Sequence, residues 1–226
     1  FKGEKIMKNK LIKLFTLLLM CLVANVSYAA YDVSPLYSRS LVYTGIGFVK
    51  VPNELTIYKQ PDLNSEVMHK LNVKKYTGDN VVETYDIRDY VSIYRPDEDL
   101  IYLQVTGEDG SGWFEVIANQ QTGERGWVFA NQNDFWTLRK FYDYYGRKNG
   151  LYLMRDIEAK YKTLYYGPYE AAKVKHAFTI VKHIKMIALK DNWMMVKITE
   201  FDNKCHLGWI RWRLDNGQIM IFPIVK

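Results

Sequence analysis

Cysteine is scarce in this sequence, which contains only Cys21 and Cys205. Cys21 lies in an apolar segment near the N-terminus, so a single cysteine is left in the rest of the chain. One cysteine cannot form a disulfide within a monomer, even in a compartment that would permit disulfides. The sequence therefore excludes a disulfide-stabilised scaffold, and we expect hydrophobic cores to stabilise the fold.

A strong charge of one sign is also missing from most of the chain. The formal net charge is +6, from 31 basic and 25 acidic residues, but five Lys and one Glu lie within residues 1–29. The remainder carries a net charge of about +2 with the two signs interspersed, whereas a surface that binds polyanions needs clustered Lys and Arg. We therefore expect no nucleic-acid partner.

One long apolar run is present, at residues 14–24, and Lys8, Lys10 and Lys13 lie just before it. The run is too short to span a bilayer, and the small residues Ser27 and Ala29 follow it with the spacing of a signal-peptidase site. The alternative is a core helix or a membrane anchor. We predict a signal peptide over residues 1–29, with residues 1–6 as upstream overhang, and export to the periplasm or the cell exterior without a remaining membrane span.

Most of the chain beyond the signal alternates apolar and polar residues and is rich in Val, Ile, Tyr, Phe and Trp, which is typical of short strands. Gly, Asn, Asp and Pro clusters separate these runs and indicate turns. Examples of such runs are residues 48–51, 101–105, 113–117 and 194–198. We predict an all-β fold of antiparallel strands, in barrels or sandwiches.

An internal repeat determines the domain organisation. Residues 56–71 recur without a gap at residues 163–178, and the identical pairs are Thr56/Thr163, Tyr58/Tyr165, Pro61/Pro168, Val67/Val174 and His69/His176. A Trp-x-x-Val motif and a Gly-Trp-(Val/Ile) motif follow in both halves, at Trp113 and Gly126 and again at Trp193 and Gly208. Three motifs in the same order predict two copies of one small unit.

We place the first copy at residues 41–132 and the second at residues 151–226. The first copy has 27 additional residues between its motifs, which we assign to an insertion near residues 78–104. An elaborated hairpin fits this segment, either as a functional lobe or as a tolerated surface loop.

Residues 133–150 form the predicted linker between the copies. Phe135, Leu138, Tyr142 and Tyr145 follow helical spacing, with Asp134 or Asn133 as the N-cap and Gly146 as the stop. The linker is too apolar to be free in solvent. We expect a short helix that packs between the two copies.

The order of these motifs resembles the bacterial SH3-like (SH3b) domain family, in which a Pro-containing loop, a Trp-x-x-Val strand and a Gly-Trp-Val strand build a small barrel. The first copy matches at Tyr58, Pro61, Val67, Trp113, Val116, Gly126, Trp127 and Val128. The second matches at Tyr165, Pro168, Val174, Trp193, Val196, Gly208, Trp209 and Ile210. The resemblance implies two tandem SH3-like barrels joined by the helical linker, and binding of peptidoglycan.

Four aromatic residues are the candidate ligand-binding positions. Trp113 and Val116 point to opposite faces of one strand, so Val116 can fill the core while Trp113 faces a groove. Burial in the core is the alternative for the rings, and we expect it for Trp127 and Trp209. The predicted ligand-binding residues are Tyr58, Trp113, Tyr165 and Trp193.

A convergent catalytic set is not apparent in the sequence, so we predict no enzymatic activity, no cofactor and no metal site. Cys205 and His206 are adjacent and would face opposite sides of a strand, which is a poor arrangement for a nucleophile and its base. The recurrence of His69 and His176 indicates a structural role, and His176 and His183 would face opposite sides of a straight strand.

These observations favour a non-catalytic exported binding protein that docks cell-wall peptide, peptidoglycan or an envelope protein through its two barrels. The alternative is a structural scaffold, or a partner subunit of an envelope complex, that binds no wall. A large exposed apolar patch on the linker helix or on the insertion would favour the alternative.

Overall fold

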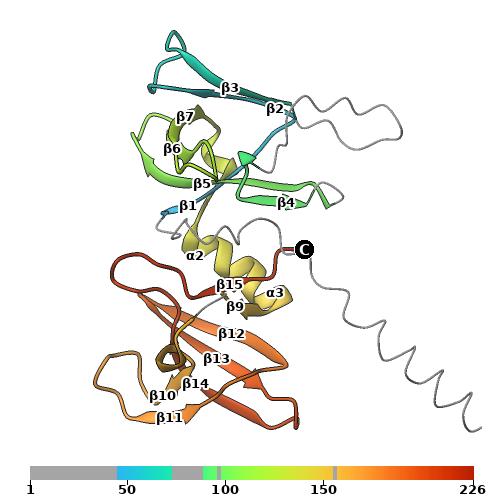
Figure 1. Ribbon diagram of the computed structural model, residues 1–226, viewed down its shortest axis with the longest axis vertical. Coiled ribbons are helices and arrows are strands. Elements are labelled where there is room, and N and C mark those ends of the chain that lie inside the picture. The colour runs from blue at the N-terminus through green and yellow to red at the C-terminus, as the bar shows by residue number, and fades with distance from the viewer. Residues whose placement is uncertain (1–44, 73–88, 96–97, 155–156) are drawn as a thin grey trace, which may run out of the picture. The chain divides into compact units, whose positions relative to one another are not determined.

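The computed structural model describes residues 45–72, 89–95, 98–154 and 157–226. Two antiparallel sheets contain most of these residues, which confirms the expectation of a mostly β protein (Figure 1). The predicted signal peptide and residues 78–88 and 96–97 of the predicted insertion lie outside the described residues.

The first sheet is built from the first half of the chain. Its strand order is β3-β2-β7-β6-β5-β1-β8, and β4 pairs with β5 as well. The bounds are β1 (Gly47–Lys50), β2 (Glu54–Tyr58), β3 (Val67–Asn72), β4 (Ile93–Arg95), β5 (Leu100–Glu108), β6 (Trp113–Ile117), β7 (Arg125–Phe129) and β8 (Phe135–Thr137).

The second sheet repeats this order strand for strand, as β11-β10-β14-β13-β12-β9-β15. The bounds are β9 (Leu151–Leu153), β10 (Thr163–Tyr165), β11 (Val174–Ala177), β12 (His183–Lys190), β13 (Trp193–Thr199), β14 (Cys205–Arg211) and β15 (Ile221–Pro223). The register of β10 against β11 shifts between Leu164 and Tyr165, as that of β2 against β3 does between Ile57 and Tyr58. The repeated residues therefore occupy equivalent places in the two sheets.

The predicted insertion boundary at residue 104 is wrong. Val105 of β5 faces Val116, and its counterpart Met186 of β12 faces Val196, with a register shift after each. Residues 102–105 thus belong to β5, which has an equivalent strand, β12, in the second sheet. The additional segment, which includes β4, precedes β5. Counting residues between motifs gave the length of the insertion but could not place its ends.

Each sheet buries alternate residues in a core. In the first sheet the inward side chains include Ile57, Leu103, Phe114, Val116 and Val128. In the second they include Leu164, Met194, Val196, Ile198 and Ile210. The period of two that predicted the strands therefore also sorts their side chains.

The linker is helical over a different range from the one predicted. The chain is helical from α2 (Leu138–Phe141) through a π-helical turn, η4 (Tyr142–Gly146), to α3 (Arg147–Asn149). Thr137 is the N-cap, because its hydroxyl accepts a hydrogen bond of 3.2 Å from the backbone N–H of Lys140. The predicted start at Asp134 or Asn133 is wrong, since those residues lie in the 3₁₀ turn η3 (Gln132–Asp134) that precedes β8.

The predicted helix stop at Gly146 is also wrong. Gly146 has the helical φ of −66°, and the helix continues to Asn149 before Gly150 ends it with a φ of +91°. A left-handed φ after the last helical residue is where glycine is favoured. Two glycines were available to end the helix, and the second is the one in the left-handed conformation.

Side chains of the helix are shared between the cores of both sheets. The ring of Phe141 lies 4.5 Å from that of Phe48 in β1, 5.5 Å from that of Tyr102 in β5 and 5.9 Å from that of Phe222 in β15. The hydroxyl of Tyr142 donates a hydrogen bond of 2.6 Å to the carbonyl oxygen of Ile221. The helix therefore contributes its apolar face to the protein's own core.

Three buried tyrosines around this helix make stability sensitive to alkaline pH. Burial raises the pKa of Tyr102, Tyr142 and Tyr145 above the usual value, and the hydroxyls of Tyr102 and Tyr145 lie 2.8 Å apart. The folded protein thus holds these protons more tightly than the unfolded chain does. Their contribution to stability is complete below the unfolded pKa of about 10 and is lost as the pH rises beyond it.

We expect the urea midpoint to fall steeply above about pH 10. Circular dichroism between pH 7 and pH 11 measures this, with Tyr142→Phe as the matched variant. That variant loses one hydrogen bond, about 1 kcal/mol at neutral pH, but should show a shallower decline above pH 10. An unchanged slope in the variant would exclude Tyr142 as a source of the pH dependence.

Candidate functional site

The outer face of the first sheet carries a row of aromatic side chains. Tyr58 of β2 faces Trp127 of β7, which in turn faces Glu115 of β6. Directly paired residues share a face, so these side chains lie opposite the core residue Val116. Trp113 lies two residues before Glu115 on the same face, and its ring meets that of Tyr58 edge to face at 5.5 Å.

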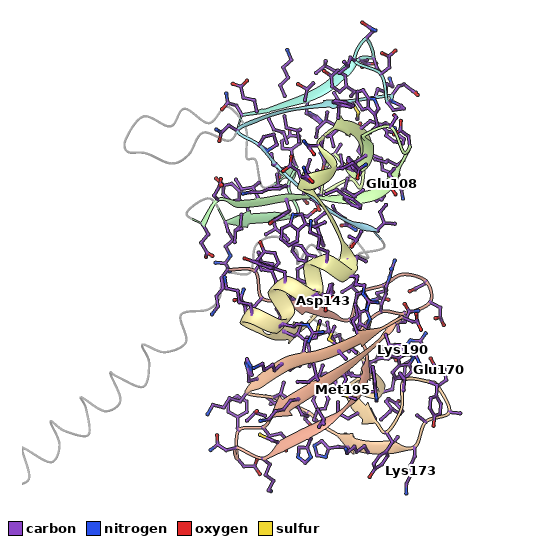
Figure 2. The ribbon with its side chains drawn as sticks, turned by 180° about the vertical axis from the view of Figure 1, so that it is seen from behind. Glu108, Asp143, Glu170, Lys173, Lys190 and Met195 are labelled. Carbon is purple, nitrogen blue, oxygen red and sulfur yellow. The ribbon has the colours of Figure 1, made fainter. Side chains whose placement is uncertain are left out.

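The second sheet repeats the arrangement. Tyr165 of β10 faces Trp209 of β14, and Trp209 faces Met195 of β13, which is labelled in Figure 2. The rings of Tyr165 and Trp193 also meet edge to face, again at 5.5 Å. The four predicted ligand-binding residues thus form two Tyr–Trp pairs at equivalent places.

The two outer faces differ at the residue that is paired with Trp113 in the first sheet and with Trp193 in the second. Trp113 pairs with Phe129, whose side chain is exposed, whereas Trp193 pairs with Arg211. The guanidinium of Arg211 lies 5.8 Å from the centre of the Trp193 ring and forms ion pairs with Glu170 and Asp215. Arg211 lowers the pKa of the Asp215 carboxyl because its guanidinium donates a hydrogen bond to that carboxylate and its positive charge favours the ionised form. The first face is therefore apolar at this point and the second is charged.

The tryptophans do not lie where the sequence analysis placed them. Trp113 and Trp193 are 7% and 8% exposed, so neither ring lies open in a groove. Trp127 and Trp209, which we expected in the core, are half-buried on the outer face. The reason is strand parity, because Val128 and Ile210 take the core positions next to them and Gly126 and Gly208 face the core without a side chain.

Exposed aromatic residues beside the Tyr–Trp pairs were not identified from the sequence. Tyr166 and Tyr169, with 61% and 59% exposure, lie on the loop between β10 and β11 that also carries Glu170 and Lys173 (Figure 2). Tyr58 and Tyr165 are half-buried. The motif comparison missed Phe129 and Arg211 because these positions differ between the copies.

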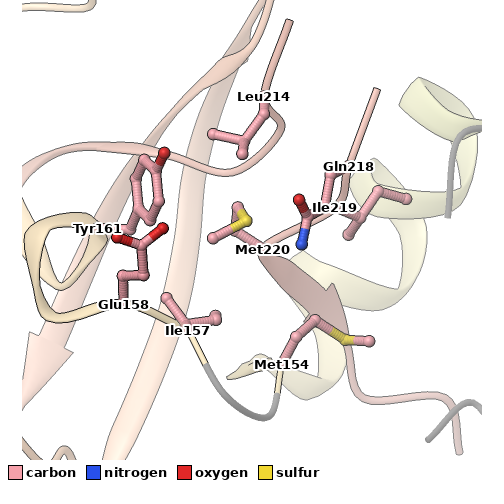
Figure 3. Close-up of a pocket in the computed structure, with 8 residues that line it drawn as sticks. All are labelled: Met154, Ile157, Glu158, Tyr161, Leu214, Gln218, Ile219 and Met220. Atoms are coloured by element: carbon pink, nitrogen blue, oxygen red, sulfur yellow. The ribbon is translucent and has the colours of Figure 1, made fainter. Parts of the chain in front are cut away.

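Two hollows in the second half of the chain are poor candidates for a small-molecule site. The first is a pocket of about 70 Å³ (Figure 3). Its lining residues are Met154, Ile157, Glu158, Tyr161, Leu214, Gln218, Ile219 and Met220. A second hollow of about 330 Å³ lies against β9 and residues 179–184. Ligand pockets usually span about 300–1,000 Å³, so the first is too small and the second only reaches the lower limit.

A group of titratable side chains comes together at one end of the second sheet. The ring of His176 in β11 stacks on that of His206 in β14 at 3.6 Å, with 7° between the ring planes. Glu200, just after β13, places Oε1 3.1 Å from Nε2 of His176 and Oε2 3.6 Å from Nε2 of His206. The sequence analysis compared His176 with His69 and His183 and missed this group, because the fold rather than the spacing brings it together.

The thiol of Cys205 contacts other residues than the two histidines and Glu200. Its Sγ is 3.5 Å from the Thr199 hydroxyl and 3.8 Å from the Asn203 carbonyl oxygen, and the residue is exposed. Neither contact supplies a base that would activate a nucleophile.

None of the helices in the described part of the chain is long and apolar enough to cross a membrane. No family model matches the sequence, and no curated protein shows significant similarity to it. The SH3b family is therefore a resemblance carried by the motifs alone.

Proposed function

We propose that the protein is an exported, non-catalytic binding protein that docks cell-wall peptide or peptidoglycan through the outer faces of its two sheets. The observation that supports this is the recurrence of one edge-to-face pair, Tyr58–Trp113 and Tyr165–Trp193, at equivalent places. A repeated pair on the face opposite each core supports a shared role in recognition. Export rests on the signal-like residues 1–29, and the peptidoglycan ligand on the SH3b resemblance.

Aromatic faces suit this role because rings supply a large contact area at a small cost in conformational entropy. The buried tryptophans hold the half-buried tyrosines in place, and the tyrosines with the exposed Phe129 or Tyr166 offer the contact surface. Two such faces in one chain would raise the avidity for a polymer that presents the same peptide repeatedly.

The scaffold alternative lacks the support that a large apolar patch on the linker helix would give. Leu138, Phe141, Tyr142 and Tyr145 are all buried in the protein's own core. Tyr144 alone among the aromatic residues of that helix is exposed. An envelope protein as the ligand of the aromatic faces is an outcome of the test below.

The purified protein should sediment with insoluble peptidoglycan at both low and high salt. The double variant Tyr58→Ala/Tyr165→Ala should weaken the apparent affinity about tenfold or more, as loss of a central aromatic contact worth over about 1.4 kcal/mol does. Tyrosine is chosen because Trp113 and Trp193 are buried and their loss would also cost stability.

Tyr144→Ala is the matched control, because it removes an exposed ring that belongs to the linker helix and to neither Tyr–Trp pair. It should sediment like the unaltered protein. If the unaltered protein fails to sediment, or the double variant sediments equally well, wall binding through these faces is excluded and the search turns to a protein partner in the envelope.

A further inference from the structure

His176, Glu200 and His206 bring together two imidazoles and a carboxylate from three separate segments of the second sheet. Their potential ligand atoms all lie within 4.8 Å of one another. His176 comes from β11, His206 from β14 and Glu200 from the turn that joins β13 to β14. We infer that these three residues form a binding site for a divalent transition-metal ion, for which Zn²⁺ is the best match.

The donor distances fit zinc. With Zn–N and Zn–O distances of about 2.0–2.2 Å, a tetrahedral ion holds its donor atoms about 3.3 Å apart. The two separations from the Glu200 oxygens, 3.1 Å to His176 and 3.6 Å to His206, lie on either side of that value. The rings are parallel, so each must rotate slightly for its lone pair to point at a common ion.

The state of His206 is a second, independent observation. Its Nε2 atom is buried, and among the described residues it has no hydrogen-bond partner. A buried polar atom without a hydrogen bond is costly, and a bound ion would satisfy it.

The chemistry of the donors selects the class of ion. Ca²⁺ and Mg²⁺ favour six or more oxygen donors, whereas imidazole nitrogen suits zinc and its neighbours in the first transition series. The charge of Lys204, which lies near Glu200, is paired with Asp202 at 2.7 Å. That pairing reduces its repulsion of a bound cation.

The site belongs to the second sheet alone. In the first sheet His69 takes the place of His176, but its ring packs against that of Tyr90 at 4.7 Å. His206 lies two residues before Gly208, and the residue at the equivalent place before Gly126 is Glu124. Without a second imidazole, the first sheet does not have the donor set that zinc favours.

Titration calorimetry on the chelator-treated protein, with Zn²⁺ as the probe, tests the site. The experiment uses a Cys21→Ser/Cys205→Ser background so that no thiol binds the ion. We expect one Zn²⁺ per chain and a rise in Tm on addition of Zn²⁺, because an ion that binds only the folded state stabilises it. Addition of Co²⁺ should give the visible absorption of a tetrahedral site, while Mg²⁺ and Ca²⁺ should give no heat.

His206→Gln and Glu200→Gln should each weaken Zn²⁺ binding at least about 100-fold, since even outer-shell partners contribute 10- to 100-fold. His183→Gln is the matched control, because His183 is exposed on β12, and it should bind as before. Circular dichroism checks that each variant is folded. If His206→Gln does not fold, the isosteric Glu200→Gln still tests the site. Absence of Zn²⁺ binding in the background protein, or equal binding by folded Glu200→Gln, would overturn the site.

Discussion

Replacing Phe141 with alanine should lower the free energy of unfolding by about 3–5 kcal/mol, as truncation of a buried aromatic ring does. Phe141 is fully buried, and its ring contacts the rings of Phe48, Tyr102 and Phe222. Because these neighbours come from both sheets, the cavity would form in a core that both share. Urea denaturation followed by circular dichroism measures the loss.

Arg139→Ala is the control for this substitution. Its side chain is 71% exposed and forms only a 3.9 Å ion pair with Asp143, so the change should cost less than about 0.5 kcal/mol. Hydrogen exchange adds a sharper test, since Phe141→Ala should reduce amide protection in β5 and β13 together. Loss of protection in only one sheet would contradict a shared core.

Gly126→Ala and Gly208→Ala should each destabilise the fold by about 1–3 kcal/mol through overpacking. A methyl group at position 126 would lie 2.5 Å from Cγ2 of Ile57, and one at position 208 would lie 2.8 Å from Cβ of Leu164. Both neighbours are fully buried, so they cannot move aside. Thermal unfolding of the two variants measures the cost.

Gly107→Ala is the matched control, because an added Cβ there meets its nearest atoms, in Glu115, at 3.7 Å, an ordinary contact. Its Tm should change little or rise slightly. Unchanged stability in Gly126→Ala and Gly208→Ala would show that the Gly-Trp motif is not required for close packing of β7 and β14 against their cores.

Local patterns predicted the strands well because alternation of apolar and polar residues reports directly on the two faces of a sheet. The repeat added more, since it placed Tyr58 and Tyr165 at equivalent positions, each at a register shift and each paired with the tryptophan of its own Gly-Trp motif. The mistake over Trp127 and Trp113 arose from giving the larger weight to ring size. Neighbouring residues of a strand point to opposite faces, so placing Val128 in the core would have placed Trp127 on the outer face.

Features set by contacts distant in sequence could not be predicted in this way. The helix start depends on β8 pairing with β1, which takes Phe135 out of the helix that its spacing suggested. The group of His176, Glu200 and His206 depends on how β11 approaches β14. No spacing rule connects those positions, because a turn and two strands lie between them.

The end strands of both sheets bear on how the protein avoids joining other chains. Exposed sheet edges are templates for aggregation, and short strands, lysine and proline make them poor ones. Here β8 and β15 have three residues each, and Pro223 ends β15 without a backbone donor. At the opposite ends, β3 carries Lys70 and β11 carries Lys175. These four end strands thus discourage strand addition, which is compatible with the proposal that the protein recognises a ligand through side chains on its outer faces.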